Sequence, residues 1–320
     1  GSFTSTSGNL QVPGTNTTVF SITGGAFYHN SGTVTSSGAS TPTITTSVGN
    51  RLNNLTLTTL TSVGGTMYVD GTFNIGTLGT FANGSNVFLK GDYTGTLTAN
   101  TGTGIITFNG SGNQNFTTTK APNVAVNKPS GSLIISANKN VGSNWNYTKG
   151  TITWGGFSIT IDAASTSTIT NGRFYDLLIN NNNTVTLAGS DCVITNKFTI
   201  TSVTSFPASV YHFKVGGDIV FTDAAYTIGT ATQKIIMNGP GLQTITGAGI
   251  CGFNLEVNKA VDSTLVGHWK LDDATGAIGV DSSGLSNTGS LINSPTWVAG
   301  QDGGALSFNG SNQYMSIANA

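Results

Sequence analysis

Charge is what this sequence most lacks. Only 8% of its 320 residues are charged and the formal net charge is −1, whereas soluble domains usually carry about 25% charged residues. A near-neutral chain offers no basic face to a phosphate backbone, so no nucleic acid partner is expected. Glutamate occurs once, at Glu256. Good helix formers never recur at a 3.6-residue period for more than about one turn, so no helix is predicted.

Long apolar runs and cysteines are also scarce. Nothing approaches ~18 consecutive apolar residues, so no membrane span is expected. No leader peptide is recognised, which a mature product or a fragment would explain. The two cysteines, Cys192 and Cys251, are expected to be small buried side chains, because disulfide frameworks belong to short, cysteine-dense chains. The histidines, His29, His212 and His268, lack metal-ligand spacing, so no metal site is predicted.

Glycine, serine, threonine and asparagine are abundant in this sequence, whereas charged residues are few. The chain has 44 glycines, and Val, Ile, Thr, Phe and Tyr are plentiful, which favours strands and turns. Short stretches alternate apolar and polar residues and are separated by glycine or Asn-Gly turn signals. The sequence therefore predicts an all-β protein.

A repeated unit organises most of the chain. The stretch 105–128 returns as 235–259, with Asn-Gly, Gln and Val-Asn-Lys at matching positions, and looser copies lie at 32–57 and 165–180. A unit that recurs several times in one chain indicates a repeat architecture. Its Asn-Leu or Asn-Val motif begins at Asn54, Asn123 and Asn254, with Asp176 at the equivalent place. These intervals fit about three coils of roughly 20–25 residues per repeat.

A parallel β-solenoid (β-helix) explains both the repetition and the missing charge better than a sandwich or an up-and-down barrel. Its coils stack ~4.8 Å apart, so that like residues lie on like. Stacked Asn and Thr side chains hydrogen-bond, whereas stacked charges repel. We therefore predict a solenoid of about 11 coils over residues 19–262, preceded by an entry segment or cap at residues 1–18.

The repeats also resemble a known family. Units such as "GIITFNGSGNQNF", "PNVAVNK" and "GTITWGGFSITID" are similar to repeats of large bacterial surface proteins that are predicted to be parallel β-helices. The resemblance covers about residues 19–260. It implies an extracellular or cell-surface location and says more about architecture than about activity.

The tail, residues 263–320, has a different texture. Its ordered features are Gly267-His268-Trp269, Asp272-Asp273, the "DSSG" of residues 281–284, Trp297 and "GGALSFNGSNQYMSI". They resemble the start of a laminin-G-like, concanavalin A-like jelly roll. That resemblance implies a lectin-like β-sandwich that is only partial here, truncated to its first strands. "DSSG" predicts an Asx-turn. A calcium site on Asp272, Asp273, Asp281 and Asp302 is the alternative, and no other cofactor is expected.

The sequence predicts a structural or adhesive role. We expect a rigid, protease-resistant spacer or filament subunit that presents the lectin-like module. Its expected partners are glycans or cell-surface polymers, and self-association into fibres by strand addition is a further possibility.

The alternative function is a polysaccharide lyase or glycoside hydrolase with its site in the solenoid groove, which needs clustered carboxylates. Asp176 with Arg173 could share one coil face, and Asp218 with Asp223 could flank a turn. Isolated Asp beside Gly is typical of turns, so no enzyme and no catalytic residue are predicted.

Two aromatic residues are predicted to contact carbohydrate. Trp145 and Tyr147 lie in the polar stretch "SNWNYT", where exposed rings could stack on sugars. Trp154 alternates with Ile152 and is expected to point inward.

Overall fold

A computed structural model describes residues 1–13, 18–22, 24–37, 43–58, 60–76, 78–81, 84–97, 101–163, 165–223, 226–228, 233–249, 251–259, 266–301 and 303–318. All regular structure in these ranges is β, and none of it is a helix that could cross a membrane. The chain divides into two compact units, Gly1–Asn258 and Lys259–Ala320.

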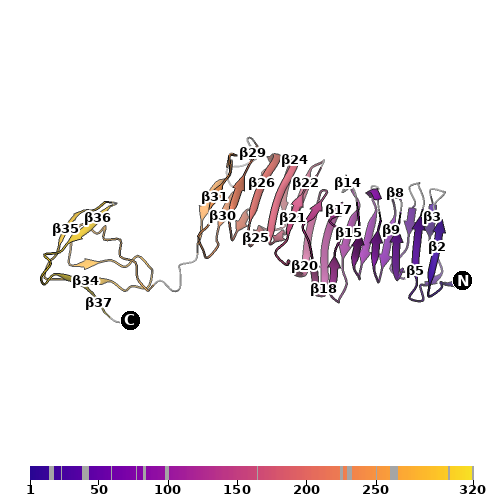
Figure 1. Ribbon diagram of the computed structural model, residues 1–320, viewed down its shortest axis with the longest axis horizontal. Coiled ribbons are helices and arrows are strands. Elements are labelled where there is room, and N and C mark those ends of the chain that lie inside the picture. The colour runs from indigo at the N-terminus through magenta and orange to yellow at the C-terminus, as the bar shows by residue number, and fades with distance from the viewer. Residues whose placement is uncertain are drawn as a thin grey trace. The chain divides into compact units, whose positions relative to one another are not determined.

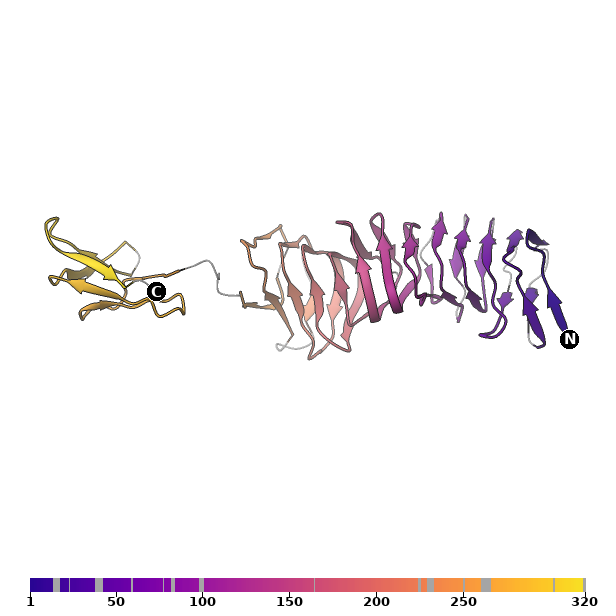
Figure 2. The same ribbon diagram turned by 90° about the horizontal axis from the view of Figure 1, so that it is seen from below.

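The first unit is a parallel β-solenoid of about 11 turns, which confirms the predicted architecture. Its strands lie side by side along one axis, each turn pairing in parallel with the turns before and after it (Figures 1 and 2). One series of stacked strands comprises β2 (Asn9–Pro13), β5 (Thr33–Ser37), β7 (Asn54–Leu57), β10 (Phe73–Ile75), β13 (Tyr93–Gly95) and β16 (Gln114–Phe116).

A second series runs beside it. It comprises β9 (Thr66–Val69), β12 (Asn86–Leu89), β15 (Ile105–Phe108), β18 (Asn123–Ile135), β20 (Trp145–Thr153), β22 (Ser167–Thr170) and β24 (Asp176–Ala188). The long strand β18 turns a corner: its first part pairs with β15 and its last part with β16.

The remaining strands of the solenoid form shorter series. One is β17 (Lys120–Ala121), β19 (Lys139–Val141), β21 (Ser158–Ile161), β24, β26 (Phe198–Phe206), β28 (Ile219–Phe221) and β31 (Ile245–Thr246), with β29 (Thr227–Ile228) beside β26. Another is β23 (Arg173–Phe174), β25 (Cys192–Ile194), β27 (Phe213–Val215), β30 (Lys234–Met237) and β32 (Asn254–Val257). Nearer the N-terminus are β1 (Ser2–Thr4) with β4 (Ala26–Tyr28), β3 (Thr18–Ser21) with β6 (Thr43–Thr45), and β8 (Leu60–Val63), β11 (Leu78–Phe81) and β14 (Thr101–Gly102).

The core consists of apolar columns that run along the axis. In the second series seven residues stack in register, and each is at most 3% exposed: Met67, Val87, Ile106, Val124, Trp145, Ile169 and Leu187. A parallel column contains Ala121, Val141, Ile161, Ile179, Ile200 and Phe221. Full burial of each larger side chain contributes about 1.5–3 kcal/mol. These columns are the apolar ladder that the repeats predict.

The solenoid begins earlier than the predicted boundary at residue 19. Strand β1 pairs in parallel with β4, and β2 pairs with β5 over five residues, Asn9 facing Thr33 and Pro13 facing Ser37. The segment predicted to be an entry segment or cap therefore supplies strands of the solenoid itself. Its alternating residues Leu10 and Val12 pack against the core.

The recurring Asn or Asp of the repeat ties successive turns together. The side-chain oxygen of Asn54 accepts a hydrogen bond from the amide of Thr72 at 2.8 Å, one turn later. Asn123 accepts from the amide of Asn144 at 2.7 Å. The Asp176 carboxylate accepts from the backbone amide of Lys197 at 2.9 Å. These side chains thus satisfy backbone groups of the next turn.

The Asn-Gly…Gln element of the repeat forms what we call a glutamine clip. The Gln114 side chain accepts from the amide of Gly110 at 2.8 Å and donates to Leu89 and Gly91 carbonyls of the preceding turn at 2.9 and 2.6 Å. Lys128, 1% exposed, then donates to Gln114 Oε1 at 2.7 Å and to two nearby carbonyls. The motif is therefore a device for satisfying buried backbone at a turn.

The same clip occurs twice more. Gln243 accepts from Gly239 at 2.9 Å and donates to two carbonyls of the preceding turn, Val215 and Gly217. In the second unit, Gln313 accepts from the amide of Asn309 at 2.8 Å. It also donates to the carbonyls of Asn293 and Ser294.

Close stacking of turns explains part of the glycine content. A Cβ on Gly91 would collide with the backbone of Gly71 in the turn below, and one on Gly239 would collide with Gly216. Only glycine allows the backbones of successive turns to approach this closely.

The second unit is built from antiparallel strands. One sheet contains β33 (Ile278–Gly279), β34 (Gly289–Ile292) and β37 (Tyr314–Ile317), and another pairs β35 (Thr296–Ala299) with β36 (Gly304–Ser307). Asp281 accepts from the amide of Ser283 at 2.8 Å, which confirms the predicted Asx-turn. Asp302 lies outside the described residues.

The glutamine clip leads to a stability prediction. Replacing Gln114 with Leu removes the partners of four polar groups inside the solenoid. We expect Gln114→Leu to lower the free energy of unfolding by at least about 2 kcal/mol, because each buried unpaired polar group costs about 1–3 kcal/mol. Chemical denaturation followed by circular dichroism measures this.

The control is Gln11→Leu, which removes two exposed hydrogen bonds, one with Asn9 and one with Ser37. It should change the free energy of unfolding by no more than about 0.5 kcal/mol. Equal effects of the two substitutions would contradict the structural role of the clip.

Candidate functional site

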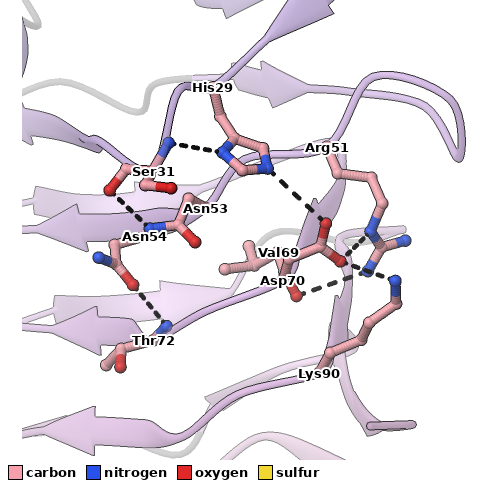
Figure 3. A network of polar contacts seen from close by, with 9 residues as sticks. All are labelled: His29, Ser31, Arg51, Asn53, Asn54, Val69, Asp70, Thr72 and Lys90. Carbon is pink, nitrogen blue, oxygen red and sulfur yellow. Dashed lines mark hydrogen bonds and ion pairs between the residues drawn. The ribbon is translucent and has the colours of Figure 1, made fainter. Parts of the chain in front are cut away.

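Charged side chains gather at one place in the N-terminal turns. Asp70 follows β9, Lys90 follows β12, His29 follows β4, and Arg51 precedes β7. Arg51 Nε donates to Asp70 Oδ1, Lys90 Nζ lies 2.9 Å from the same oxygen, and His29 Nε2 lies 4.0 Å from Asp70 Oδ2. Figure 3 shows the three basic side chains converging on the one carboxylate. We call these four residues the charged cluster.

The stacking of turns brings the cluster together. Val69 and Leu89 are register partners in β9 and β12, so the residues that follow them, Asp70 and Lys90, occupy equivalent places on successive turns. The amide of Lys90 donates to the carbonyl of Val69 at 2.9 Å, and the amide of Asp70 donates to that of Leu52 at 2.8 Å. Like positions on neighbouring turns here carry opposite charges, which attract each other.

The turn that carries Arg51 is held by its neighbour, Asn50. The Asn50 side chain accepts from the amide of Phe27 at 2.7 Å and donates to the carbonyl of Gly25 at 3.0 Å. Phe27 belongs to β4, so Asn50 fixes this turn to the strand that leads to His29. Asn50 is buried, and its loss would release both turns.

His29 is held by a sharp turn. Asn30 and Ser31 have positive φ angles of 46° and 56°. The amide of Ser31 donates to His29 Nδ1 at 3.0 Å. Because Nδ1 accepts this bond, the proton of the neutral ring lies on Nε2, which faces Asp70.

The balance of charge at the cluster is positive. Burial raises the pKa of Asp70, but hydrogen bonds and charges from Lys90 and Arg51 outweigh it and hold the pKa below its ordinary value of 3.8. Asp70 is therefore ionised at neutral pH. One negative charge then faces two permanent positive charges, with His29 beside them.

An open cavity and aromatic rings adjoin the cluster. The cavity has a volume of about 420 Å³ and is lined by Phe27, Tyr28, His29, Asn30, Gly49, Arg51 and Asp70. Tyr28 is 58% exposed. The guanidinium of Arg51 also lies 5.3 Å from the ring centroid of Tyr68, which stacks on Phe88 at 4.8 Å. Phe88 and Tyr68 face outward because the residues that flank them in their strands face the core.

The structure corrects the expected exposure of Trp145. Its side chain is 0% exposed and belongs to an apolar column, so it is not available to stack on a sugar. The surrounding Asn144 and Asn146 are the exposed residues. Tyr147 is half-buried and donates its hydroxyl to the carbonyl of Gly150 at 2.6 Å.

Trp154, expected to point inward, is only half-buried. It packs against Trp145 and Phe174 with ring centroids 6.1 and 6.0 Å apart. It also lines a shallow cleft of about 340 Å³ with Tyr147 and Arg173. Of the two predicted carbohydrate contacts, Tyr147 therefore lines a cleft and Trp145 lies beneath it.

The Asp residues considered for a hydrolase site, Asp176, Asp218 and Asp223, accept hydrogen bonds from neighbouring turns instead. Asp176 bonds Asn196 and Lys197, and Asp218 accepts from the amide of Thr244 at 2.7 Å. Asp223 accepts from the amide of Val203 at 2.6 Å. Within the described ranges, no group of three or more His, Cys, Asp or Glu side chains could hold a metal ion.

Sequence reasoning missed the charged cluster, treating His29 and Asp70 as isolated residues. One available signal was spacing. Arg51 and Asp70 are 19 residues apart, and Lys90 lies 20 residues beyond Asp70 (90 − 70 = 20). Charged residues that are separated by the length of one coil are expected to lie next to each other on one face of the solenoid.

Comparisons of the chain with protein-family models, with curated proteins and with solved structures find no match. Function is therefore inferred from the geometry of this chain alone.

One further ionisable group is buried inside the solenoid. Lys139 is 0% exposed and occupies an inward position of β19, register partner of Ile159. Its ammonium donates to the carbonyl of Thr117 at 3.3 Å and lies 5.0 Å from the ring centroid of Phe116. Burial lowers the pKa of Lys139 from its ordinary 10.5 to about 8. The charged form therefore destabilises the fold at neutral pH.

This predicts a pH dependence for Lys139→Met. Below pH 8 the lysine is charged in both states, so the variant is expected to be more stable than the parent chain. Between pH 8 and 10.5 the unfolded parent binds more protons than the folded one, so its stability rises with pH relative to the variant. The urea midpoints of the parent chain and of Lys139→Met, measured from pH 7 to 9.5, should approach each other as the pH rises.

Lys149→Met, at an exposed lysine, is the control. The difference between its urea midpoint and that of the parent chain should stay the same across this pH range. A constant difference for Lys139→Met as well would show that Lys139 is not desolvated.

Proposed function

We propose that this chain is an extracellular spacer whose solenoid holds a lectin-like module, formed by the second unit, away from a cell surface. The observation that carries the proposal is the continuous apolar column from Met67 to Leu187, which joins seven strands without interruption. Stacked turns that share one column can be extended along the axis by adding further turns, as a spacer requires.

Rigidity follows from the way the turns are joined. Each turn is bonded to the next by parallel backbone ladders, by the side chains of Asn54, Asn123 and Asp176, and by the glutamine clips. Bending would stretch the columns on one side, which close-packed interiors resist. Proteolysis needs local opening of the backbone, so the turns that these ladders and side chains hold together are expected to resist it.

The geometry of the carboxylates favours a spacer over a hydrolase. Glycoside hydrolases use two carboxyl groups about 5–9.5 Å apart. The cavity beside the charged cluster is lined by one carboxylate, Asp70, among the residues described. Asp70 is moreover bonded to Arg51 and Lys90, so it is a poor general acid or nucleophile.

The lectin-like assignment of the second unit rests on sequence and on its antiparallel strands. Trp269 donates from its indole to the carbonyl of Asn287 at 2.8 Å, and Asp281 links the amides of His268 and Ser283. The residues that carry the resemblance thus support one another in the fold.

The spacer role predicts that length scales with the number of turns. Inserting three extra copies of residues 86–104, which follow one coil from β12 to β15, should lengthen the solenoid by about 14 Å at ~4.8 Å per turn. Small-angle X-ray scattering on the full chain measures the maximum dimension, and circular dichroism tests that strand content rises.

The matched control inserts the same residues in shuffled order, which should unfold locally and yield a flexible loop. An ordered insertion that leaves the cross-section larger and the length unchanged would overturn the spacer proposal.

A further inference from the structure

We propose that the cavity beside the charged cluster binds an acidic sugar, with the carboxylate of a uronic acid held by Arg51 and His29. Lys90, which pairs with Asp70 next to the cavity, adds positive charge that attracts this carboxylate. This inference goes beyond the spacer role, because it places a binding site on the solenoid itself. It also does not depend on the second unit being lectin-like.

The first argument is the excess of positive charge. The whole chain has 12 Lys and Arg residues, yet two of them meet at one carboxylate, Asp70. A single ion pair would have been enough to neutralise Asp70. The second cation and the adjoining imidazole leave the cavity with a net attraction for a negative group.

The second argument is the set of hydrogen-bond donors that face the cavity. Arg51 has five N–H groups, and its contacts within the described residues engage Nε with Asp70 and Nη2 with the Val69 carbonyl at 3.5 Å. His29 Nε2 lies 4.0 Å from Asp70, beyond hydrogen-bond range. The remaining N–H groups of the Arg51 guanidinium and the Nε2–H of His29 can therefore donate hydrogen bonds to a ligand. A planar carboxylate can accept two parallel hydrogen bonds from one guanidinium.

The third argument is shape. Arg51 is held in place, with a side chain 13% exposed, between Asp70 and the ring of Tyr68. A preset arginine loses little conformational freedom on binding. The cavity volume of about 420 Å³ is in the range of small-ligand sites, about 300–1,000 Å³, and accommodates a sugar ring as well as its carboxylate.

The fourth argument is the exposed aromatic ring at the rim. Tyr28 lines the cavity and is 58% exposed, although it has a large apolar ring. Sugar rings present an apolar face that packs against such rings, with hydroxyl groups at the edge. A bare inorganic anion would gain nothing from Tyr28, so the combination favours an acidic saccharide.

The test measures binding of tetragalacturonate to the full chain by isothermal titration calorimetry, with its methyl ester as the uncharged ligand. We expect the acid to bind and the ester to bind at least tenfold more weakly. Equal binding of the two, or no binding of the acid at millimolar concentration, would overturn the proposal.

Variants locate the site. Lys90→Gln should weaken binding of tetragalacturonate about tenfold, whereas Lys149→Gln, at an exposed lysine on another turn, should not change it. Equal losses for the two would show that binding is a general charge effect and would overturn the assignment. The double variant Arg51→Gln/Asp70→Asn removes the arginine without leaving an unpaired carboxylate, and it should abolish binding while circular dichroism stays unchanged.

A final variant separates sugar from simple anion. Tyr28→Ala should weaken the binding of tetragalacturonate. The weak binding of acetate, measured from chemical-shift changes, should stay the same. If Tyr28→Ala has no effect on tetragalacturonate, the site binds carboxylates without recognising the sugar, and the saccharide proposal fails. Failure of the spacer proposal would appear in the scattering experiment and would leave these measurements unaffected.

Discussion

In the parallel ladders of the solenoid, side chains lie on the equivalent side chains of the turn below, at the spacing of strands in a sheet. This constraint decides which residues the chain can use. Apolar residues form continuous columns, as from Met67 to Leu187. Charges of one sign would repel at every turn, which explains why so few residues are charged. Where charges are stacked, as in Asp70 and Lys90, their signs alternate.

The same constraint explains how buried backbone is satisfied at the corners. A turn cannot rely on water when another turn covers it, so side chains must provide the partners. The glutamine clip does this at Gln114 and Gln243, and it recurs at Gln313 in a unit with antiparallel strands. The clip is therefore a local solution for an Asn-Gly turn that works in either kind of sheet.

Much of the fold could be predicted because repetition reports the length of a turn directly. The all-β class, the solenoid and its number of turns follow from the spacing of Asn54, Asn123 and Asn254. The parallel pairing of residues 1–13 with the next turn was not predicted, because Leu10 and Val12 are the main sign of alternation in a short segment. The sandwich of the second unit stays a prediction.

The candidate site was harder to predict than the fold. Trp145 was expected to be exposed because of its polar neighbours, yet in a strand Asn144 and Asn146 face away from it, and the alternation points Trp145 inward. The charged cluster depends on contacts between four separate turns. Its members can be found only when the length of each turn is known, since Arg51 and Asp70 meet across 19 residues.

The last turn of the solenoid differs from those before it. Its column residues Leu255 and Val257 are 45% and 68% exposed, although their register partners Ile235 and Met237 are buried. A turn that packs against one neighbour keeps only half of the stacking energy that an interior turn has. We therefore expect local opening to begin at β32, and each strand that detaches would leave the next strand with the same loss of stacking energy.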